Sequence, residues 1–237
     1  MENSMEKAAR KKLVALTGAG ISAESGLKTF RDSDGLWENH DVMEVASIEG
    51  WHRNPGLVLE FYNQRRRQLE SALPNEAHKI LAELEVCFDV RIITQNVDDL
   101  HERAGSTHVL HLHGELTKAR SIRDESRVYD IGYGEIFLGQ TGEDGAQLRP
   151  NIVWFGEAVP LILEAERQVQ SADIFAVIGS SLVVYPAAGL ATVLHPNARA
   201  FLIDPKGVEK YLPSNFTFIK ETATRGVAKM RDILLES

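Results

Sequence analysis

Short apolar runs rich in β-branched residues recur along the chain, and they end at glycine or at polar residues. The clearest, at 12–17 and 173–179, are apolar almost throughout, which is typical of strands buried on both faces of a sheet. The predicted strands lie at 12–17, 87–94, 108–113, 173–179, 200–203 and 216–219.

Helical spacing of apolar residues fills the segments between these runs. Leu57, Phe61 and Leu69 predict a helix over 56–73, which Pro74 ends. Further helices are predicted at 75–86, 97–104, 160–171, 186–194 and 222–235. Strands that alternate with helices predict an α/β fold, a Rossmann-like parallel sheet with helices on both faces.

Two segments depart from this alternation and predict a small, discontinuous second lobe. Residues 25–54 have weak periodicity, and residues 115–151 combine charge clusters with an isolated apolar patch. The predicted division is a Rossmann-like domain at 1–27, 75–114 and 158–237, and a small lobe with a loop and a helical insertion at 28–74 and 115–157.

Composition narrows the possible partners. The 237 residues carry a formal net charge of −8, which argues against nucleic acid and anionic membranes because both bind basic surfaces. No apolar run approaches the roughly 20 residues that span a bilayer, and the polar N-terminus lacks the apolar core of a signal peptide. We therefore expect a cytoplasmic protein. The single cysteine, Cys87, excludes an intramolecular disulfide and a zinc site made of cysteines.

Two glycine-containing turns, at 18–23 and 179–181, follow predicted strands. Glycine lets a backbone approach a pyrophosphate, although such turns often serve only to reverse the chain. The carboxyl ends of parallel strands converge, so both turns and Asp204, which ends the next strand, predict a dinucleotide site. A hydride-transferring enzyme fits poorly, because a loop stands where its second strand and acidic residue belong.

Polar side chains also end the strand at 87–94. Gln95, Asn96 and Asp98 are suited to hydrogen bonds with a ribose and a carboxamide, and equally to capping a helix. His111 and His113 are expected on one strand face, because strand side chains alternate. No third metal ligand accompanies them, so a neutral imidazole acting as general base is the simpler interpretation.

Five blocks of sequence resemble the sirtuin family of NAD-dependent protein-lysine deacylases. They follow the family's order and cover most of residues 12–204: GAGISAESGLKTFR (18–31), TQNVDDLHERAG (94–105), HLHGEL (111–116), PNIVWFGE (150–157) and GSSLVVYPAAGL (179–190). The resemblance implies a set of NAD-binding residues: Gly18, Ala19, Gly20, Ile21, Phe30, Arg31, Gln95, Asn96, Asp98, Gly179, Ser180, Ser181 and Asp204. Asp204 is less secure, since many relatives have Asn there.

The resemblance also implies the chemistry. Asn96 and Asp98 orient the nicotinamide for departure, and His113 is the catalytic base, so that an acyl group passes from lysine to ADP-ribose. The backbone of the acylated protein pairs with the segment Val153–Glu157 as an added strand. The implied substrate-binding residues there are Val153, Phe155, Gly156 and Glu157, with Phe155 walling the lysine tunnel. Without the family, Trp154 and Phe155 would be assigned to the core.

Tyr62 and Arg65 are spaced i, i+3 and share a helix face. Taken alone they read as a tyrosine at the core edge and an arginine in a solvated basic run. Their spacing resembles the Tyr-x-x-Arg of the class III branch, which prefers acidic acyl groups. An arginine holds a carboxylate through two charge-assisted hydrogen bonds and a phenol adds a third. We expect removal of succinyl or malonyl groups beside deacetylation.

The small lobe departs from the family. Most sirtuins carry four zinc cysteines there, whereas the corresponding positions in this chain are Ser121, Asp124, Thr141 and Asp144. None is a thiolate, so no zinc is expected. We expect burial of an apolar set to fix the lobe instead: Tyr129, Ile131, Tyr133, Ile136, Phe137 and Leu138.

Two other functions use the same NAD residues. A mono-ADP-ribosyltransferase attacks the ribose with a protein side chain, and an NAD or ADP-ribose sensor performs no chemistry. The presence of His113, Asn96 and Asp98 favours the deacylase, because pure binding needs no base.

Overall fold

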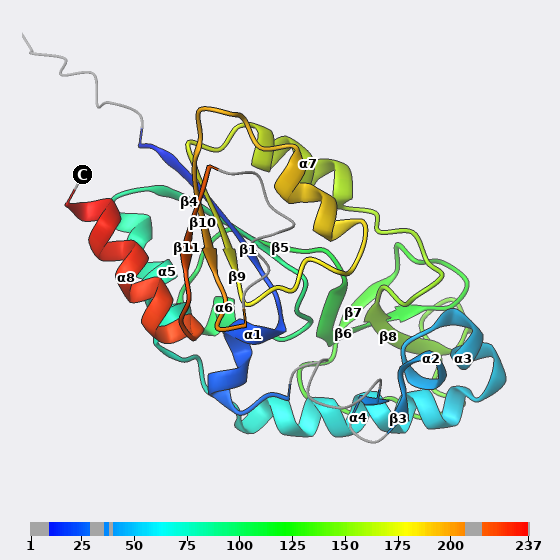
Figure 1. Ribbon diagram of the computed structural model, residues 1–237. Coiled ribbons are helices and arrows are strands. Elements are labelled where there is room, and N and C mark those ends of the chain that lie inside the picture. Colours follow the sequence, from blue (N-terminus) through cyan, green and yellow to red (C-terminus); the bar gives the residue numbers. More distant parts are fainter. Residues whose placement is uncertain (1–9, 29–35, 38–39, 207–214, 237) are drawn as a thin grey trace, which may run out of the picture.

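The computed structural model describes residues 10–28, 36–37, 40–206 and 215–236 (Figure 1). Within them the larger sheet has six parallel strands in the order β11-β10-β9-β1-β4-β5. Its strands are β1 (Lys12–Thr17), β4 (Asp89–Thr94), β5 (Val109–His111), β9 (Ile174–Ile178), β10 (Arg199–Ile203) and β11 (Phe216–Ile219). The predicted α/β fold with a parallel sheet is confirmed.

Helices cover both faces of this sheet, because the residues of β1 alternate between two cores. Leu13 and Ala15 pack in a cluster with α5 and α8, whereas Val14 and Leu16 pack with α7 and the 3₁₀ helix η3 (Figure 1). The helical elements around the sheet are α1 (Ala19–Ser22), η1 (Ala23–Ser25), α5 (Glu76–Glu83), η2 (Leu84–Val86), α6 (Leu100–Ala104), α7 (Ile162–Gln170), η3 (Ala187–Thr192) and α8 (Ala223–Leu235).

A second, antiparallel sheet and three helices share a separate core, which includes Trp51, Phe61, Leu116 and Trp154. The elements of this lobe are β2 (Leu36–Trp37), β3 (His40–Asp41), α2 (Val42–Val45), α3 (Ile48–Arg53), α4 (Pro55–Ser71), β6 (Gly114–Ser121), β7 (Val128–Asp130) and β8 (Leu148–Ile152). The domain boundaries given above stay a prediction.

Most elements begin and end close to their predicted bounds. Asn75 caps α5 as expected, through a hydrogen bond of 3.0 Å from the Ala77 amide to its Oδ1. The helix predicted at 186–194 is a 3₁₀ segment, and the strand predicted at 108–113 stops at His111. Cys87 is exposed and follows η2 at the amino-terminal end of β4. Among the described residues, no helix is both long and apolar enough to cross a membrane.

Candidate active site

A cavity of about 680 Å³ lies at the carboxyl ends of β1, β4, β9 and β10, and the small lobe forms its other wall. It is lined by both glycine turns, by the segment that follows β4, by α4 and by residues 152–159. The predicted NAD and substrate residues that the structure describes are therefore brought to one cavity, apart from the buried Ile21. Phe30 and Arg31 lie outside the described residues.

The two glycine turns touch each other. The Gly20 amide donates to the Gly179 carbonyl over 2.9 Å, and a Cβ added at Gly20 would lie 2.6 Å from the Gly179 Cα. Gly179 itself has φ +61°, a conformation that favours glycine. The two turns therefore pack backbone against backbone and present no side chain at these glycines to the cavity that they line, which fits a pyrophosphate. Helix α1, which follows Gly18, has only four residues, so its dipole contributes little.

Asn96 and Asp98 are linked through Ser22, a residue that the sequence did not single out. The Asn96 Nδ2 lies 3.1 Å from the Ser22 hydroxyl and donates to the Gly18 carbonyl over 3.2 Å. Ser22 donates to the Asp98 carboxylate over 2.9 Å. Burial raises the pKa of Asp98, although hydrogen bonds from Ser22 and from the Leu100 amide oppose the shift. These hydrogen bonds hold the Asn96 and Asp98 side chains in place beside the glycine turns.

His113 presents one ring nitrogen for proton transfer. Its Nδ1 lies 3.0 Å from the Gln95 carbonyl. A carbonyl only accepts, so Nδ1 carries the proton and Nε2 of the neutral ring has a free lone pair. Burial lowers the pKa of His113, which keeps the ring neutral at pH 7. The imidazole is therefore neutral and has an unprotonated nitrogen, Nε2, which are the two requirements of a general base.

His111 does not share a face with His113, so that expectation is wrong. His113 lines the large cavity, whereas His111 lines a second one on the other side of Val153. β5 has ended at His111, and Gly114 turns the chain with φ +81°, so strand alternation no longer applies. His111 bonds to the Asn96 carbonyl over 3.1 Å and to Glu102 over 2.8 Å. It thus supports the segment that carries Asn96.

The remaining NAD candidates lie at the ends of β4, β9 and β10. Gln95 donates to the Ser180 hydroxyl over 2.8 Å, which joins two of the turns. Asp204 accepts from the Lys206 amide over 2.8 Å and forms a turn of its own. Ser181 also lines the cavity.

Tyr62 and Arg65 of α4 also line the cavity. Both are buried, so the alternative of a solvated arginine is wrong for Arg65. Burial raises the pKa of the Tyr62 hydroxyl, which stays protonated, and its oxygen accepts from the indole of Trp154 over 2.9 Å. The two predicted acyl-binding side chains thus share one cavity with His113.

The predicted substrate strand has most of its backbone N–H groups already bonded. Val153 donates to His113, Trp154 to the Glu157 carboxylate, and Phe155 to Ala46. Within the described part of the chain, the Gly156 amide and the Val153 carbonyl have no such partner. Gly156 has φ +89°, and a Cβ there would lie 2.9 Å from Ile48. Pairing of a peptide with this segment is thus confined to few backbone groups.

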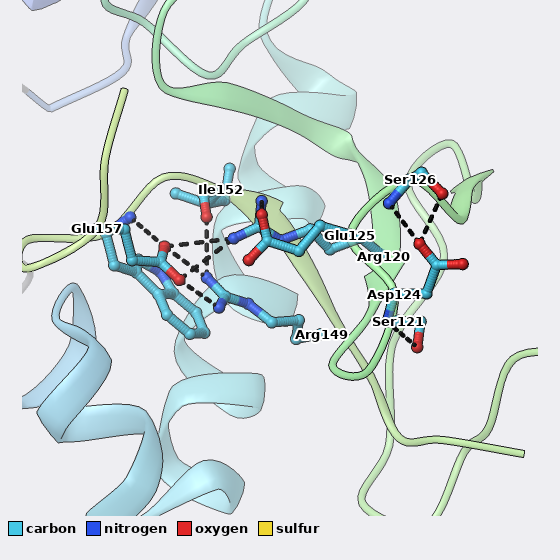
Figure 2. A network of polar contacts seen from close by, with 9 residues as sticks. Arg120, Ser121, Asp124, Glu125, Ser126, Arg149, Ile152 and Glu157 are labelled. Atoms are coloured by element: carbon cyan, nitrogen blue, oxygen red, sulfur yellow. Dashed lines mark hydrogen bonds and ion pairs between the residues drawn. The ribbon is translucent and has the colours of Figure 1, made fainter. Parts of the chain in front are cut away.

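The Glu157 side chain is not available to a substrate. Arg149 donates to its two oxygens over 2.6 and 2.9 Å, and Arg120 approaches them at 3.2 and 3.3 Å (Figure 2). All three side chains are largely buried. Their charges compensate one another inside the lobe, so Glu157 contributes to substrate pairing only through its backbone.

The four positions that correspond to zinc ligands do not form a metal site. Ser121 donates to Asp144 over 2.6 Å. Asp124 accepts from the amide and hydroxyl of Ser126 over 3.1 and 2.6 Å (Figure 2). The Thr141 backbone instead forms a bridge with Gln147. No cluster of three or more His, Cys, Asp or Glu among the described residues is arranged to hold a metal ion. The donor set present does not fit tetrahedral zinc, which prefers thiolate and imidazole.

The expected apolar replacement is only partly present. Ile136 is fully buried, and Tyr129, Ile131 and Tyr133 pack against the small-lobe core. Phe137 and Leu138 are 60% and 68% exposed, so their expected burial is wrong. The chain turns outward after Ile136, whose amide donates to Asn63 over 3.0 Å.

The fold and the paired glycine turns define a nucleotide-binding protein with an open parallel sheet. The Sir2 family pattern matches residues 18–186. The NAD-dependent protein deacylase of Helicobacter pylori (strain ATCC 700392 / 26695) is 57% identical over 95% of this chain and 98% of its own. That of Bacteroides thetaiotaomicron is 52% identical over 95% of this chain and 98% of its own. The chain belongs to the Sir2 family.

Solved structures show the same similarity. A Sir2 homologue in complex with NAD superimposes with a TM-score of 0.84 at 38% identity, covering 95% of this chain and 91% of its own. A mutant Sir2 homologue in complex with ADP-ribose has a TM-score of 0.85 at 36% identity, covering 100% and 99%.

Proposed function

We propose that this chain is an NAD-dependent protein-lysine deacylase whose substrates are acylated lysines of proteins. The observation that carries the proposal is the position of His113, a neutral base in the cavity that the glycine turns line. Full-length similarity to proteins named NAD-dependent protein deacylase supports it.

The residues of the site have different roles in binding NAD and in proton transfer. NAD, when bound, would supply a ribose carbon that the acyl oxygen attacks as nicotinamide leaves, and a ribose hydroxyl that takes the acyl group. Gly18, Gly20 and Gly179 let the two turns that line the cavity pack backbone against backbone, and these turns are where we place the pyrophosphate. Asn96 and Asp98 orient the nicotinamide end, and His113 Nε2 accepts a proton from a ribose hydroxyl. Incubation with NAD and an acetyl-lysine peptide tests this proposal: deacylated peptide and O-acyl-ADP-ribose are expected by mass spectrometry.

We propose further that the enzyme removes succinyl and malonyl groups in addition to acetyl. Arg65 and Tyr62 lie in the cavity at the end that α4 closes. A buried cation and a protonated phenol match a carboxylate at the end of the acyl chain. An acetyl group has no carboxylate to pair with them.

Arg65→Met is expected to lower kcat/KM for a succinyl-lysine peptide by roughly 10–150-fold, the size of a lost charged hydrogen bond. Deacetylation of the same peptide sequence is expected to change little. Steady-state rates with both peptides measure the ratio. Arg67→Met is the matched control, because Arg67 lies on the exposed side of the same helix and pairs with Glu60. Equal loss of both activities in Arg65→Met would sink the assignment.

We also propose that the small lobe folds without zinc. Hydrogen bonds among Ser121, Asp144 and Asp124 replace metal bonds, and Arg123 donates to the Asp144 carbonyl over 2.7 Å. The melting temperature is therefore expected to be unchanged in a strong chelator. Differential scanning fluorimetry with and without chelator checks this, and metal analysis of the untreated protein is the control. A large drop in melting temperature would show that a metal holds the lobe.

A further inference from the structure

Trp154 contacts both Arg149 and Tyr62. A role in the core alone does not explain these contacts. The Arg149 guanidinium lies over its ring, with Cζ 3.4 Å from the ring centroid. Its indole Nε1–H donates to the Tyr62 hydroxyl oxygen over 2.9 Å. Trp154 is 2% exposed and Tyr62 is fully buried. Water does not compete for this hydrogen bond, so its geometry is well determined.

The arginine is itself held in place from the other side. Besides its two bonds to Glu157, Arg149 donates to the Ile152 carbonyl over 2.9 Å (Figure 2). The Trp154 amide donates to the same Glu157 carboxylate over 2.8 Å. The backbone of Trp154 and the cation above its ring therefore share one anchor, which sets the direction of the indole N–H.

The direction of this hydrogen bond determines what Tyr62 offers to a ligand. An indole nitrogen only donates, so the Tyr62 oxygen is the acceptor. The hydroxyl hydrogen of Tyr62 must then point away from Trp154. A phenol that already accepts in this way acts as a donor toward a further group, which suits an anion. Arg65 lines the same cavity as Tyr62.

We propose that Trp154 is a specificity-determining positioning residue, which orients the Tyr62 hydroxyl as a donor toward the carboxylate of an acidic acyl-lysine. Arg149 and Glu157 hold the indole in the required orientation. The inference rests on the proposed acyl preference, and it assigns Trp154 an action through the Tyr62 hydroxyl rather than through a hydrogen bond of its own to the acyl carboxylate. Its effect is confined to substrates with an acyl carboxylate.

Trp154→Phe tests this, because phenylalanine keeps a ring beneath Arg149 and lacks the N–H donor. KM for the succinyl-lysine peptide is expected to rise roughly three- to tenfold, the range for one neutral hydrogen bond. The kcat with that peptide, and both constants with the acetyl-lysine peptide, are expected to stay within about twofold. A general packing defect would instead lower the activity toward both peptides.

A double-mutant cycle with Tyr62→Phe identifies the route. If Trp154 acts through the Tyr62 hydroxyl, Trp154→Phe adds nothing further once that hydroxyl is gone. Additive effects, equal loss with both peptides, or an unchanged succinyl KM would overturn the inference. If Trp154→Phe does not fold, KM for both peptides is measured with Arg149→Lys instead. Lysine lacks the planar fork that grips Glu157, so the same selective rise in KM is expected, and its absence counts against the inference.

The proposed function can fail separately. If the wild-type protein removes succinyl groups no faster than Arg65→Met does, the acyl preference is wrong, and this inference falls with it. If wild type prefers succinyl and Trp154→Phe keeps its full preference, only the role of Trp154 is wrong.

Discussion

His113→Ala is expected to lower kcat for deacylation by about 10²- to 10⁴-fold, which is the usual contribution of a general base. The NAD affinity is expected to persist, because the glycine turns, Asn96 and Asp98 are untouched. Mass spectrometry of the peptide measures the rate, and calorimetry measures NAD binding. His108→Ala is the matched control, since His108 is exposed.

The role of His113 as a base also predicts how the activity changes with pH. A base must be neutral to accept a proton, so activity falls as pH decreases through the pKa of His113. Burial lowers that pKa below the ordinary value of 6.5, so the midpoint of the acid limb of kcat/KM is expected below pH 6.5. The acid limb is expected to disappear in His113→Ala. An unchanged limb in that variant would assign the titration to another group.

Gly20→Ala is expected to remove NAD binding and to destabilise the protein. The new Cβ would lie 2.6 Å from the Gly179 Cα and 2.8 Å from the Gly179 oxygen, and both are backbone atoms that cannot move alone. Overpacking of this kind costs about 1–3 kcal/mol, or roughly 2–12 °C in melting temperature for a chain of this size. Calorimetry with NAD and thermal melting measure the two effects.

Gly189→Ala serves as the control for Gly20→Ala. Nothing lies within 4 Å of a Cβ at Gly189, and its φ is ordinary, so stability and NAD binding are expected to change little. If Gly20→Ala bound NAD as well as this control does, the close approach of the two turns would not be required for binding.

The larger sheet could be predicted from sequence because each of its strands is marked by a local run of apolar residues. β1 and β9 are short apolar runs that are buried on both faces of the sheet. Such runs, between segments with helical spacing, are typical of central strands in a parallel sheet covered by helices on both sides. The paired glycines at 18, 20 and 179 followed from the same logic, because carboxyl ends of neighbouring strands converge.

The small lobe could not be predicted in the same way, because charged residues such as Arg66, Arg120 and Arg149 are buried beside its apolar core. β6 contains Lys118, Arg120 and Ser121 and reads as an exposed segment. Arg120 is buried between two carboxylates, Glu125 at 3.6 Å and Glu157, and Glu157 lies 37 residues away in sequence. Arg66 is likewise fully buried, although it stands in a basic run that reads as solvated. One partner, the Asn63 side chain, lies one turn earlier on α4, but the other, the Leu116 carbonyl, becomes a neighbour only when α4 packs on β6.

Trp154 was missed for a related reason. An aromatic residue among apolar ones is assigned to the core, and the assignment is right as far as burial goes. Its hydrogen bond to Tyr62 spans 92 residues and depends on the rotation of the indole, which no local pattern encodes.

The single cysteine of this chain has a consequence for its chemistry in an oxidising cell. Thiolates are the groups that peroxide and disulfides attack most readily, and a lobe held by four of them would lose its structure on oxidation. Here hydroxyl, carboxylate and guanidinium groups hold the corresponding turns, and these groups do not react with mild oxidants. Cys87 lies at the opposite end of β4 from Gln95, so its oxidation leaves the cavity intact. We therefore expect mild thiol oxidants to leave the activity unchanged.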